Sequence, residues 1–250
     1  MDLSIVVPAT PDGQSTLRFL NSVRDTLDFI QAEIMVIDPS GGRLTALFSV
    51  EHPGIMVYEC SKAETIGQAT KQALQLCKGR YISLWQPDTI LAEDCLRDLL
   101  NFLDDNPETG MVGPRFFTES GKVMHSAGIL PSMLALFQLL GLGTHRRILP
   151  HPAEMFLFSP EFNQPAEVDW LMAGGLIIRR ETFEEIGWPD ADFSPEFATL
   201  DLCRRSRRAG WHHHYLPTAT IIKHTPPALK ASWPDTCRYL LRQWRDLFWG

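Results

Sequence analysis

The sequence lacks the features that mark zinc-ribbon, disulfide-rich or nucleic-acid-binding proteins. Its five cysteines are scattered singly, so there is no CxxC pair of the kind that binds zinc. Basic residues are in deficit, with 23 Lys and Arg against 30 Asp and Glu and a formal net charge of −7. Because proteins that bind nucleic acid through its phosphates usually carry a basic excess, we do not expect nucleic acid as a partner.

Long apolar runs and targeting segments are also missing. The longest apolar stretch, 129–143, is interrupted by Pro131, Gln138 and Gly141. It is shorter than the roughly 20 residues that cross a bilayer. No N-terminal segment resembles a signal peptide, and single scattered thiols suit a reducing compartment. We therefore expect a cytoplasmic protein, located either in solution or at the inner face of the membrane.

What the sequence does contain is an ordinary core-forming composition, 44% hydrophobic and 21% charged, and an alternating pattern. Short apolar runs rich in β-branched residues alternate with helical periodicity, and the runs are 3–8, 34–37, 55–58 and 81–85. This alternation predicts βαβ units and a mostly parallel sheet with helices on both faces. Ligands of such sheets bind beyond the carboxyl ends of the strands.

The second half of the chain is less regular. The pattern predicts strands at 111–115, 174–179 and 220–223, with helices from about residue 181 and over 200–208. Prolines, glycines and aromatics dominate 128–165, which predicts no regular element there. An aromatic stripe follows at 233–249, and its spacing predicts an amphipathic C-terminal helix.

Asp88 stands directly after one of the predicted strands, in the sequence Trp-Gln-Pro-Asp-Thr. A carboxylate in such a place needs a partner, and a divalent cation is one partner that it could have. The alternative is that Asp88 only caps the helix that follows.

His224 follows the last predicted strand and is a second candidate ligand, although a hydrogen-bonded structural histidine is the alternative. The run His212-His213-His214 is different. Adjacent side chains of a strand point to opposite faces, so these three rings are not expected to converge on one ion.

In their order and spacing, eight segments resemble the family-two glycosyltransferases of the GT-A fold, especially the rhamnosyltransferase-like branch. The segments are SIVVP at 4–8, MVID at 35–38, GRYISLWQPDT at 79–89, VDWLMAGGLIIRRETF at 168–183, EIG at 185–187, DLCRR at 201–205, AGW at 209–211 and IIKH at 221–224. The resemblance implies a GT-A sheet that binds a nucleotide and an acceptor-side half that follows it. It also implies transfer of a sugar, with inversion, from a nucleotide-diphosphate donor to a hydroxyl of a glycan or lipid-linked glycan, as in polysaccharide biosynthesis.

The resemblance also implies roles for particular residues. Those that match nucleotide contacts are Pro8, Ala9, Asp38 and Gly67, with Asp38 on the base. Those that match the donor-sugar and acceptor side are Trp170, Gly174, Gly175 and Asp201. Asp88 and His224 match the residues that hold Mg²⁺ or Mn²⁺ on the diphosphate, where the cation stabilises charge as the sugar bond breaks.

One departure from the family concerns the general base. Relatives carry a Glu-Asp pair just before the residue that matches Asp201, and this chain has Ala198-Thr199 there. Glu196 or Asp192 is a candidate substitute base. The alternative is a binding or scaffolding module that has kept the fold and lost the base.

The sequence predicts a glycosyltransferase-like domain over 1–228, divided into a nucleotide-binding half, 1–112, and an acceptor half, 113–228. The C-terminal helix, 229–250, is a candidate surface for a homodimer. Arg146 and Arg147 lie beside an apolar stretch and are candidates for peripheral membrane contact, with a core-packed helix as the alternative.

Overall fold

The computed structural model describes residues 1–28, 30–61, 63–128, 163–224, 238–239 and 241–242. The stretch around Arg146 and Arg147 and most of the C-terminal segment lie outside these residues, so the membrane-contact and dimer predictions are not addressed by it. No helix of the described part is both long and apolar enough to cross a membrane.

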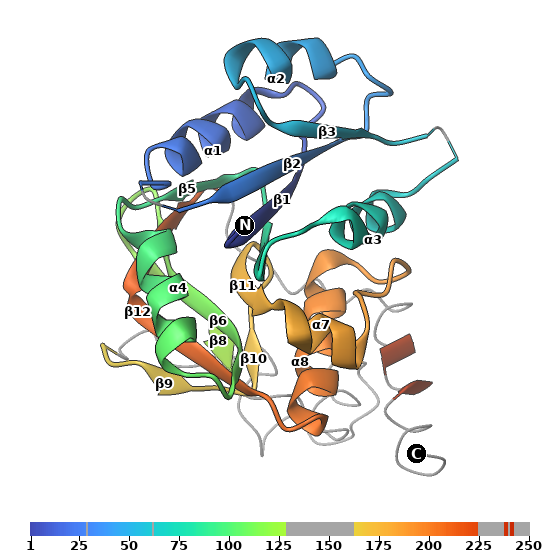
Figure 1. Ribbon diagram of the computed structural model, residues 1–250. Helices are drawn as coiled ribbons and strands as arrows, with labels where there is room; N and C mark the ends of the chain where they lie inside the picture. Colours follow the sequence, from blue (N-terminus) through green and yellow to red (C-terminus); the bar gives the residue numbers. More distant parts are fainter. Residues whose placement is uncertain (29, 62, 129–162, 225–237, 240, 243–250) are drawn as a thin grey trace, which may run out of the picture.

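The first half of the chain forms four parallel strands in the order β3-β2-β1-β4. The strands are β1 (Leu3–Pro8), β2 (Ala32–Asp38), β3 (Met56–Glu59) and β4 (Tyr81–Trp85). The helices between them are α1 (Gln14–Arg24), α2 (Thr45–Glu51) and α3 (Ile66–Leu76). In Figure 1, α1 and α2 lie above these strands and α3 lies below, so helices cover both faces of the sheet.

The second half continues the same sheet as β4-β11-β6-β12-β5. Its strands are β5 (Thr89–Leu91), β6 (Thr109–Thr118), β11 (Gly175–Arg179) and β12 (His212–Lys223), with β7 (Val123–Met124) and β9 (Ala166–Glu167) beside them. β8 (Ala127–Gly128) and β10 (Trp170–Leu171) form a separate pair. The helices are α4 (Cys95–Asp105), α7 (Arg180–Ile186) and α8 (Pro195–Arg208).

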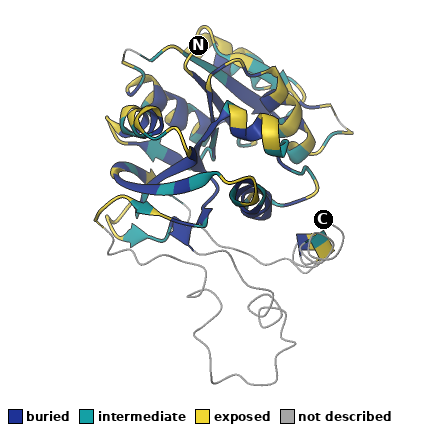
Figure 2. Cartoon of the chain, turned by 60° about the horizontal axis from the view of Figure 1, so that its bottom comes forward, coloured by how far each residue is buried: buried dark blue, intermediate teal, exposed yellow. Residues whose placement is uncertain are grey.

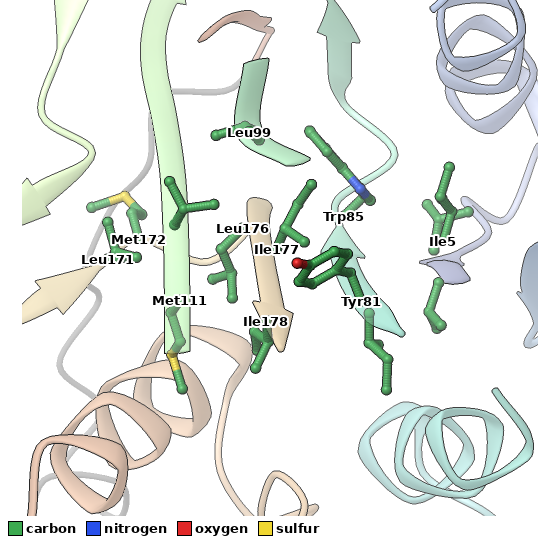
Figure 3. Packing of buried hydrophobic residues seen from close by; sticks show 14 of the residues in the cluster. Ile5, Tyr81, Trp85, Leu99, Met111, Leu171, Met172, Leu176, Ile177 and Ile178 are labelled. Atoms are coloured by element: carbon green, nitrogen blue, oxygen red, sulfur yellow. The ribbon is translucent and has the colours of Figure 1, made fainter. Parts of the chain in front are cut away.

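The core lies on the central strands. Buried residues are concentrated there in Figure 2, and exposed residues lie along the outer sides of the helices. Figure 3 shows Ile177 of β11 between Tyr81 and Trp85 of β4 on one side and Met111 of β6 on the other. These side chains pack into one apolar layer that joins the two halves of the sheet.

The α/β prediction is confirmed, and β1 and β4 begin and end where the sequence predicts. One expectation was wrong, because the residues after Asp88 form the edge strand β5 before α4 begins. The sequence analysis did not predict the direction of β11, which runs antiparallel to both of its neighbours. An antiparallel strand in the middle of the sheet makes the second half mixed, which short apolar runs alone do not reveal.

Candidate active site

A pocket of about 200 Å³ lies where the carboxyl ends of β1 and β4 meet the first turns of α3 and α8. Its lining is mostly apolar and comes from segments far apart in the sequence. The lining residues are Val6, Pro8, Ile66, Gly67, Thr70, Leu84, Trp85, Gln86, Ala173, Gly174, Pro189, Asp190, Phe193, Pro195, Ala198, Thr199 and Leu202. A concave apolar site with a few polar groups at the strand ends is where an α/β sheet binds its ligand.

Three of the predicted binding residues lie in this lining, namely Pro8, Gly67 and Gly174. Gly174 has a φ of +101°, and a Cβ there would come within 2.8 Å of the Gln86 Oε1 atom. Glycine is therefore required both by the backbone conformation and by the close approach. Ala9 is buried beside the pocket and donates its N–H to Ile37 O at 2.8 Å.

Asp38 is fully buried at the end of β2, where it holds its own turn together. Its carboxylate accepts hydrogen bonds from the N–H groups of Ser40 at 2.7 Å and Leu44 at 3.1 Å. Burial acts to raise the pKa of Asp38, but hydrogen bonding from the Ser40 side chain and from backbone N–H groups outweighs it, and the pKa is lowered. Its predicted contact with a nucleotide base stays a prediction.

Asp88 and His224 come together in the structure, because β5 and β12 pair antiparallel and place Thr89 opposite Lys223. The His224 N–H donates to the Asp88 carbonyl oxygen at 2.9 Å. Their side chains have different partners, however. The Asp88 carboxylate accepts from Lys223 Nζ at 2.8 Å, and His224 Nδ1 bonds to Glu119. Sequence reasoning missed Lys223, whose signal was a cation directly after the apolar pair Ile221-Ile222.

The residues around Asp88 do not form a ready-made metal site in the described part of the chain. In the described part of the chain, no group of three or more His, Cys, Asp or Glu is arranged to hold a metal ion. The negative charge of Asp88 is already matched by the buried ammonium of Lys223, and Gln86 contributes a neutral amide to the same cluster. His224 Nε2 is buried without a hydrogen-bond partner among the described residues, but one imidazole nitrogen is a weak site for Mg²⁺ or Mn²⁺, which prefer several carboxylate, water and phosphate oxygens.

The predicted substitute bases do not line the pocket. Glu196 lies on the first turn of α8 and Asp192 is exposed in the loop before it, and neither belongs to the lining. Ala198 and Thr199 do line the pocket, at the place where the acidic pair of relatives was expected. Among the described residues, Asp190 is the one carboxylate in the lining, and sequence reasoning missed it.

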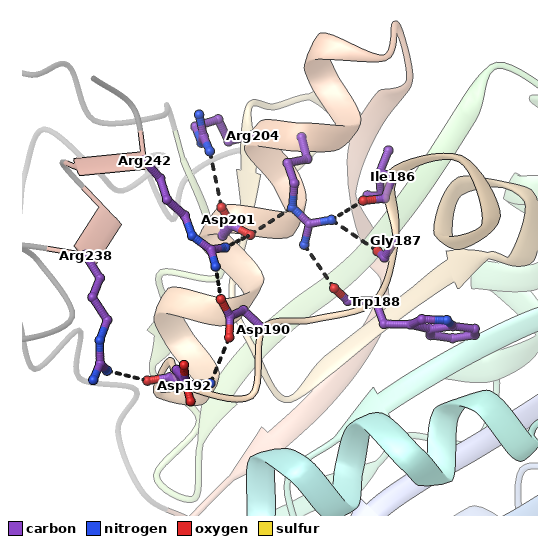
Figure 4. Close-up of polar contacts among 10 residues, drawn as sticks. Ile186, Gly187, Trp188, Asp190, Asp192, Asp201, Arg204, Arg238 and Arg242 are labelled. Carbon is purple, nitrogen blue, oxygen red and sulfur yellow. Dashed lines mark hydrogen bonds and ion pairs between the residues drawn. The ribbon is translucent and has the colours of Figure 1, made fainter. Parts of the chain in front are cut away.

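Asp190 is held in place by its surroundings, as Figure 4 shows. Its Oδ1 atom accepts the N–H of Asp192 at 2.9 Å, and its Oδ2 atom is paired with Arg242. Arg238 donates to the Asp192 carbonyl at 2.6 Å, so two arginines of the C-terminal segment contact this loop. A carboxylate has about four lone-pair directions, and these two contacts use two of them.

Three of the predicted donor and acceptor residues lie in the interior. Asp201 is fully buried and pairs with Arg205 at 2.8 Å and Arg204 at 3.3 Å, so it holds α8 in place. Trp170 is 1% exposed on β10, and Gly175 lies in β11, where a Cβ would come within 2.9 Å of Ile221 Cδ1. None of these three is in the pocket lining, and their predicted contacts with donor or acceptor stay predictions.

The three consecutive histidines of β12 diverge, as expected. His212 contacts Glu167 at 2.9 Å, His214 Nδ1 bonds Thr109 Oγ1 at 3.0 Å, and His213 is fully buried against Asp169 and Ser206. Each ring has its own partner, so the run is structural.

Comparisons with known proteins agree with this architecture. The family model described as Glycosyl transferase family 2 matches residues 4–187. An N-acetylglucosaminyl-diphospho-decaprenol L-rhamnosyltransferase of Mycobacterium tuberculosis (strain CDC 1551 / Oshkosh) is 27% identical over 148 residues, which are 58% of this chain and 47% of that protein. An uncharacterized protein of Sinorhizobium fredii is 23% identical over 183 residues, which are 69% of this chain and 19% of that protein.

Among solved structures, the crystal structure of GalNAc-T7 with UDP, GalNAc and Mn²⁺ has a TM-score of 0.68 at 17% identity. The similarity covers 98% of this chain and 49% of that one, and at this identity it shows the GT-A fold. The chain therefore spans about half the length, or less, of these relatives. Since the family model covers well over half of the 250 residues, the chain belongs to glycosyl transferase family 2.

Proposed function

We propose that this protein transfers a sugar from a nucleotide-diphosphate donor to an acceptor hydroxyl with inversion. The observation that carries the proposal is the pocket at the carboxyl ends of β1 and β4. It is lined by Pro8, Gly67 and Gly174, three of the residues for which the family resemblance implies substrate contacts. The match to glycosyl transferase family 2 supports the same reaction class.

In this reaction the acceptor oxygen forms a bond to the anomeric carbon while the bond from that carbon to the diphosphate oxygen breaks. The electron pair of the broken bond leaves with the diphosphate, and the acceptor hydroxyl must lose its proton. General-base assistance to such a step typically contributes 10²–10⁴ in rate. We assign this role to Asp190, because its carboxylate lines the pocket and Glu196 and Asp192 do not.

The acceptor is proposed to be a glycan or a lipid-linked glycan. The name of the mycobacterial relative includes a lipid-linked glycan, N-acetylglucosaminyl-diphospho-decaprenol. Such an acceptor would place the protein at the inner face of the membrane and in polysaccharide biosynthesis. The expectation that Mg²⁺ or Mn²⁺ binds at Asp88 and His224 stays a prediction, with the Lys223 ion pair against it.

A second candidate function is a binding or scaffolding module that recognises a nucleotide or sugar without turnover. The observation that favours it is that Ala198 and Thr199 line the pocket where the acidic pair of relatives was expected. Neither side chain can take a proton from a hydroxyl at neutral pH.

The test combines donor binding with transfer. UDP-, GDP- and dTDP-sugars are screened by thermal shift with and without Mn²⁺, and the donor that binds is assayed for sugar transfer to lipid-linked and free glycan acceptors. We expect Asp190→Asn to bind the donor like the wild type and to lose transfer by about 10²–10⁴. The matched controls, Asp192→Asn and Glu196→Gln, should keep transfer within a fewfold of wild type.

If either control loses transfer while Asp190→Asn stays active, the general base is Asp192 or Glu196, as the sequence predicts, and not Asp190. Donor binding without transfer in the wild type would favour the binding module. Absence of binding with every donor would contradict the proposed function.

A further inference from the structure

Lys223 places a positive charge beside Gln86, which lines the pocket, and beside Asp88, the residue expected to bind a metal. Its side chain is 2% exposed, and its ammonium donates to Asp88 Oδ1 at 2.8 Å and to Gln86 Oε1. An ammonium in the interior is stable only when it is paired and hydrogen-bonded, and these two contacts provide both. The antiparallel pairing of β5 with β12 fixes this arrangement, because it sets Lys223 opposite Thr89.

The ion pair changes the charge that a ligand meets at the strand end. Asp88 alone would present a full negative charge, which repels a diphosphate unless a cation lies between them. With Lys223 beside it, the pair is neutral overall, so an anionic ligand near Gln86 does not meet an uncompensated carboxylate.

Gln86 connects the ion pair to the pocket. It lines the pocket, and its carbonyl oxygen accepts from Lys223. With the oxygen turned toward the ammonium, the amide N–H groups are the part of Gln86 that is left to donate to an acceptor, such as a phosphate oxygen. Lys223 is thus placed to orient Gln86 as a donor, without touching the ligand itself.

We propose that this chain binds the diphosphate of its donor without a divalent cation, because Lys223 neutralises Asp88 and orients the Gln86 amide as a hydrogen-bond donor. This inference rests on the proposed function, since it concerns the same donor. Lys223 acts as a positioning residue, through Asp88 and Gln86. A divalent cation on Asp88 would compete with the ammonium for the carboxylate, and an ammonium left unpaired in the interior is strongly unfavourable.

The Lys223→Met variant should need a divalent cation to bind the donor, whereas the wild type should not. Removal of the ammonium frees the Asp88 carboxylate, so a divalent cation can take its place. We expect wild-type protein to bind UDP, GDP or dTDP with the same affinity in EDTA and in Mn²⁺. Lys223→Met should bind at least about tenfold more weakly in EDTA and recover in Mn²⁺, as isothermal titration calorimetry would measure. A role in folding alone would not create a requirement for metal.

The double variant Asp88→Asn/Lys223→Met is the matched control. It removes both charges together, which avoids an unpaired carboxylate at Asp88, and its folding is checked by circular dichroism and melting temperature. Without a carboxylate, it should show no recovery in Mn²⁺.

Wild-type binding that is lost in EDTA and restored by Mn²⁺ would overturn this inference and leave the proposed function standing. Lys223→Met binding that ignores metal as the wild type does would overturn the role of Lys223. If the wild type binds no nucleoside diphosphate under either condition, the proposed function fails, and this inference fails with it.

Discussion

At the scale of single residues, His213 shows how burial sets a charge state. It is fully buried in β12, with Nδ1 against the Asp169 carbonyl at 3.1 Å and Nε2 against Ser206 Oγ at 3.0 Å. Burial disfavours the imidazolium and is the largest influence on the ring, lowering the pKa of His213 from 6.5 to about 4. The folded protein therefore holds this histidine neutral.

The lowered pKa predicts a loss of stability in mild acid. Between the folded and unfolded pKa values the unfolded chain binds the additional proton, so stability is complete above about pH 6.5 and falls as the pH drops toward 4. From about pH 7.5 to about pH 5 we expect His213 to account for about 2 kcal/mol of lost unfolding free energy. Urea denaturation at the two pH values measures it.

His213→Gln is the control for this effect, because glutamine is uncharged across the same range. Its stability should fall less between the two pH values than that of the wild type, by about the same 2 kcal/mol. The pKa values of His52 and His214 are also lowered by burial, so a smaller fall in the same direction remains in the variant. Equal falls in both proteins would contradict the assignment to His213.

At the scale of elements, the pocket depends on the contact between α3 and the loop before α8. Thr65 caps α3 with its side chain and forms a reciprocal capping box with Gln68, which fixes where the helix begins. Gly67 on the first turn then faces the loop so closely that a Cβ would lie 2.5 Å from the Ala191 carbonyl oxygen. Ala191 directly follows Asp190, so this contact positions the proposed base.

Gly67→Ala should therefore lower stability and disturb the pocket together. The added methyl group must push the Ala191 backbone away, and overpacking of this kind costs about 1–3 kcal/mol, more than the roughly 1 kcal/mol that alanine gains in a helix. Lys71→Ala, an exposed position on the same helix, should stay within about 0.5 kcal/mol. Chemical denaturation of both variants checks this, and a Gly67→Ala protein as stable as Lys71→Ala would show that the loop moves freely.

The elements that the sequence predicts are those whose pattern is local. The apolar runs of β1 and β4 and the capped periodicity of α3 specify strand or helix by themselves. The antiparallel direction of β11 and the short β5 depend on pairing with strands distant in the sequence, and no local pattern encodes that.

The residues of the candidate site also fall into those that local sequence predicts and those that it does not. Gly67 and Gly174 were found through motif positions, and their backbone geometry explains why glycine is there. Asp190 and Lys223 were missed for different reasons. Asp190 lies in a loop, and the conformation of that loop decides which acidic residue lines the pocket. Lys223 comes close to Asp88 only through the register between β5 and β12.

At the scale of the whole molecule, the sheet runs without a break from the first half of the chain into the second. β4 pairs with β11, and β11 with β6. Arg179, at the end of β11, joins the same parts through its side chain. It is 6% exposed and donates to the carbonyls of Leu103 at 2.6 Å, Thr109 at 3.2 Å and Asn106 at 3.3 Å. The contacts with Leu103 and Asn106 satisfy the C-terminal end of α4, and the contact with Thr109 reaches the start of β6.

This continuity predicts that the two halves unfold together. Arg179→Met keeps much of the apolar side chain but leaves several buried carbonyls without a donor, each at a cost of about 1–3 kcal/mol. We expect the free energy of unfolding to fall by about 3–5 kcal/mol in a single transition, the same by tryptophan fluorescence as by circular dichroism. Arg97→Met removes an exposed arginine that pairs with Asp94 and should change stability by no more than about 0.5 kcal/mol. Two separate transitions, with only one shifted by Arg179→Met, would mean that residues 1–112 and 113–228 fold as independent units despite the shared sheet.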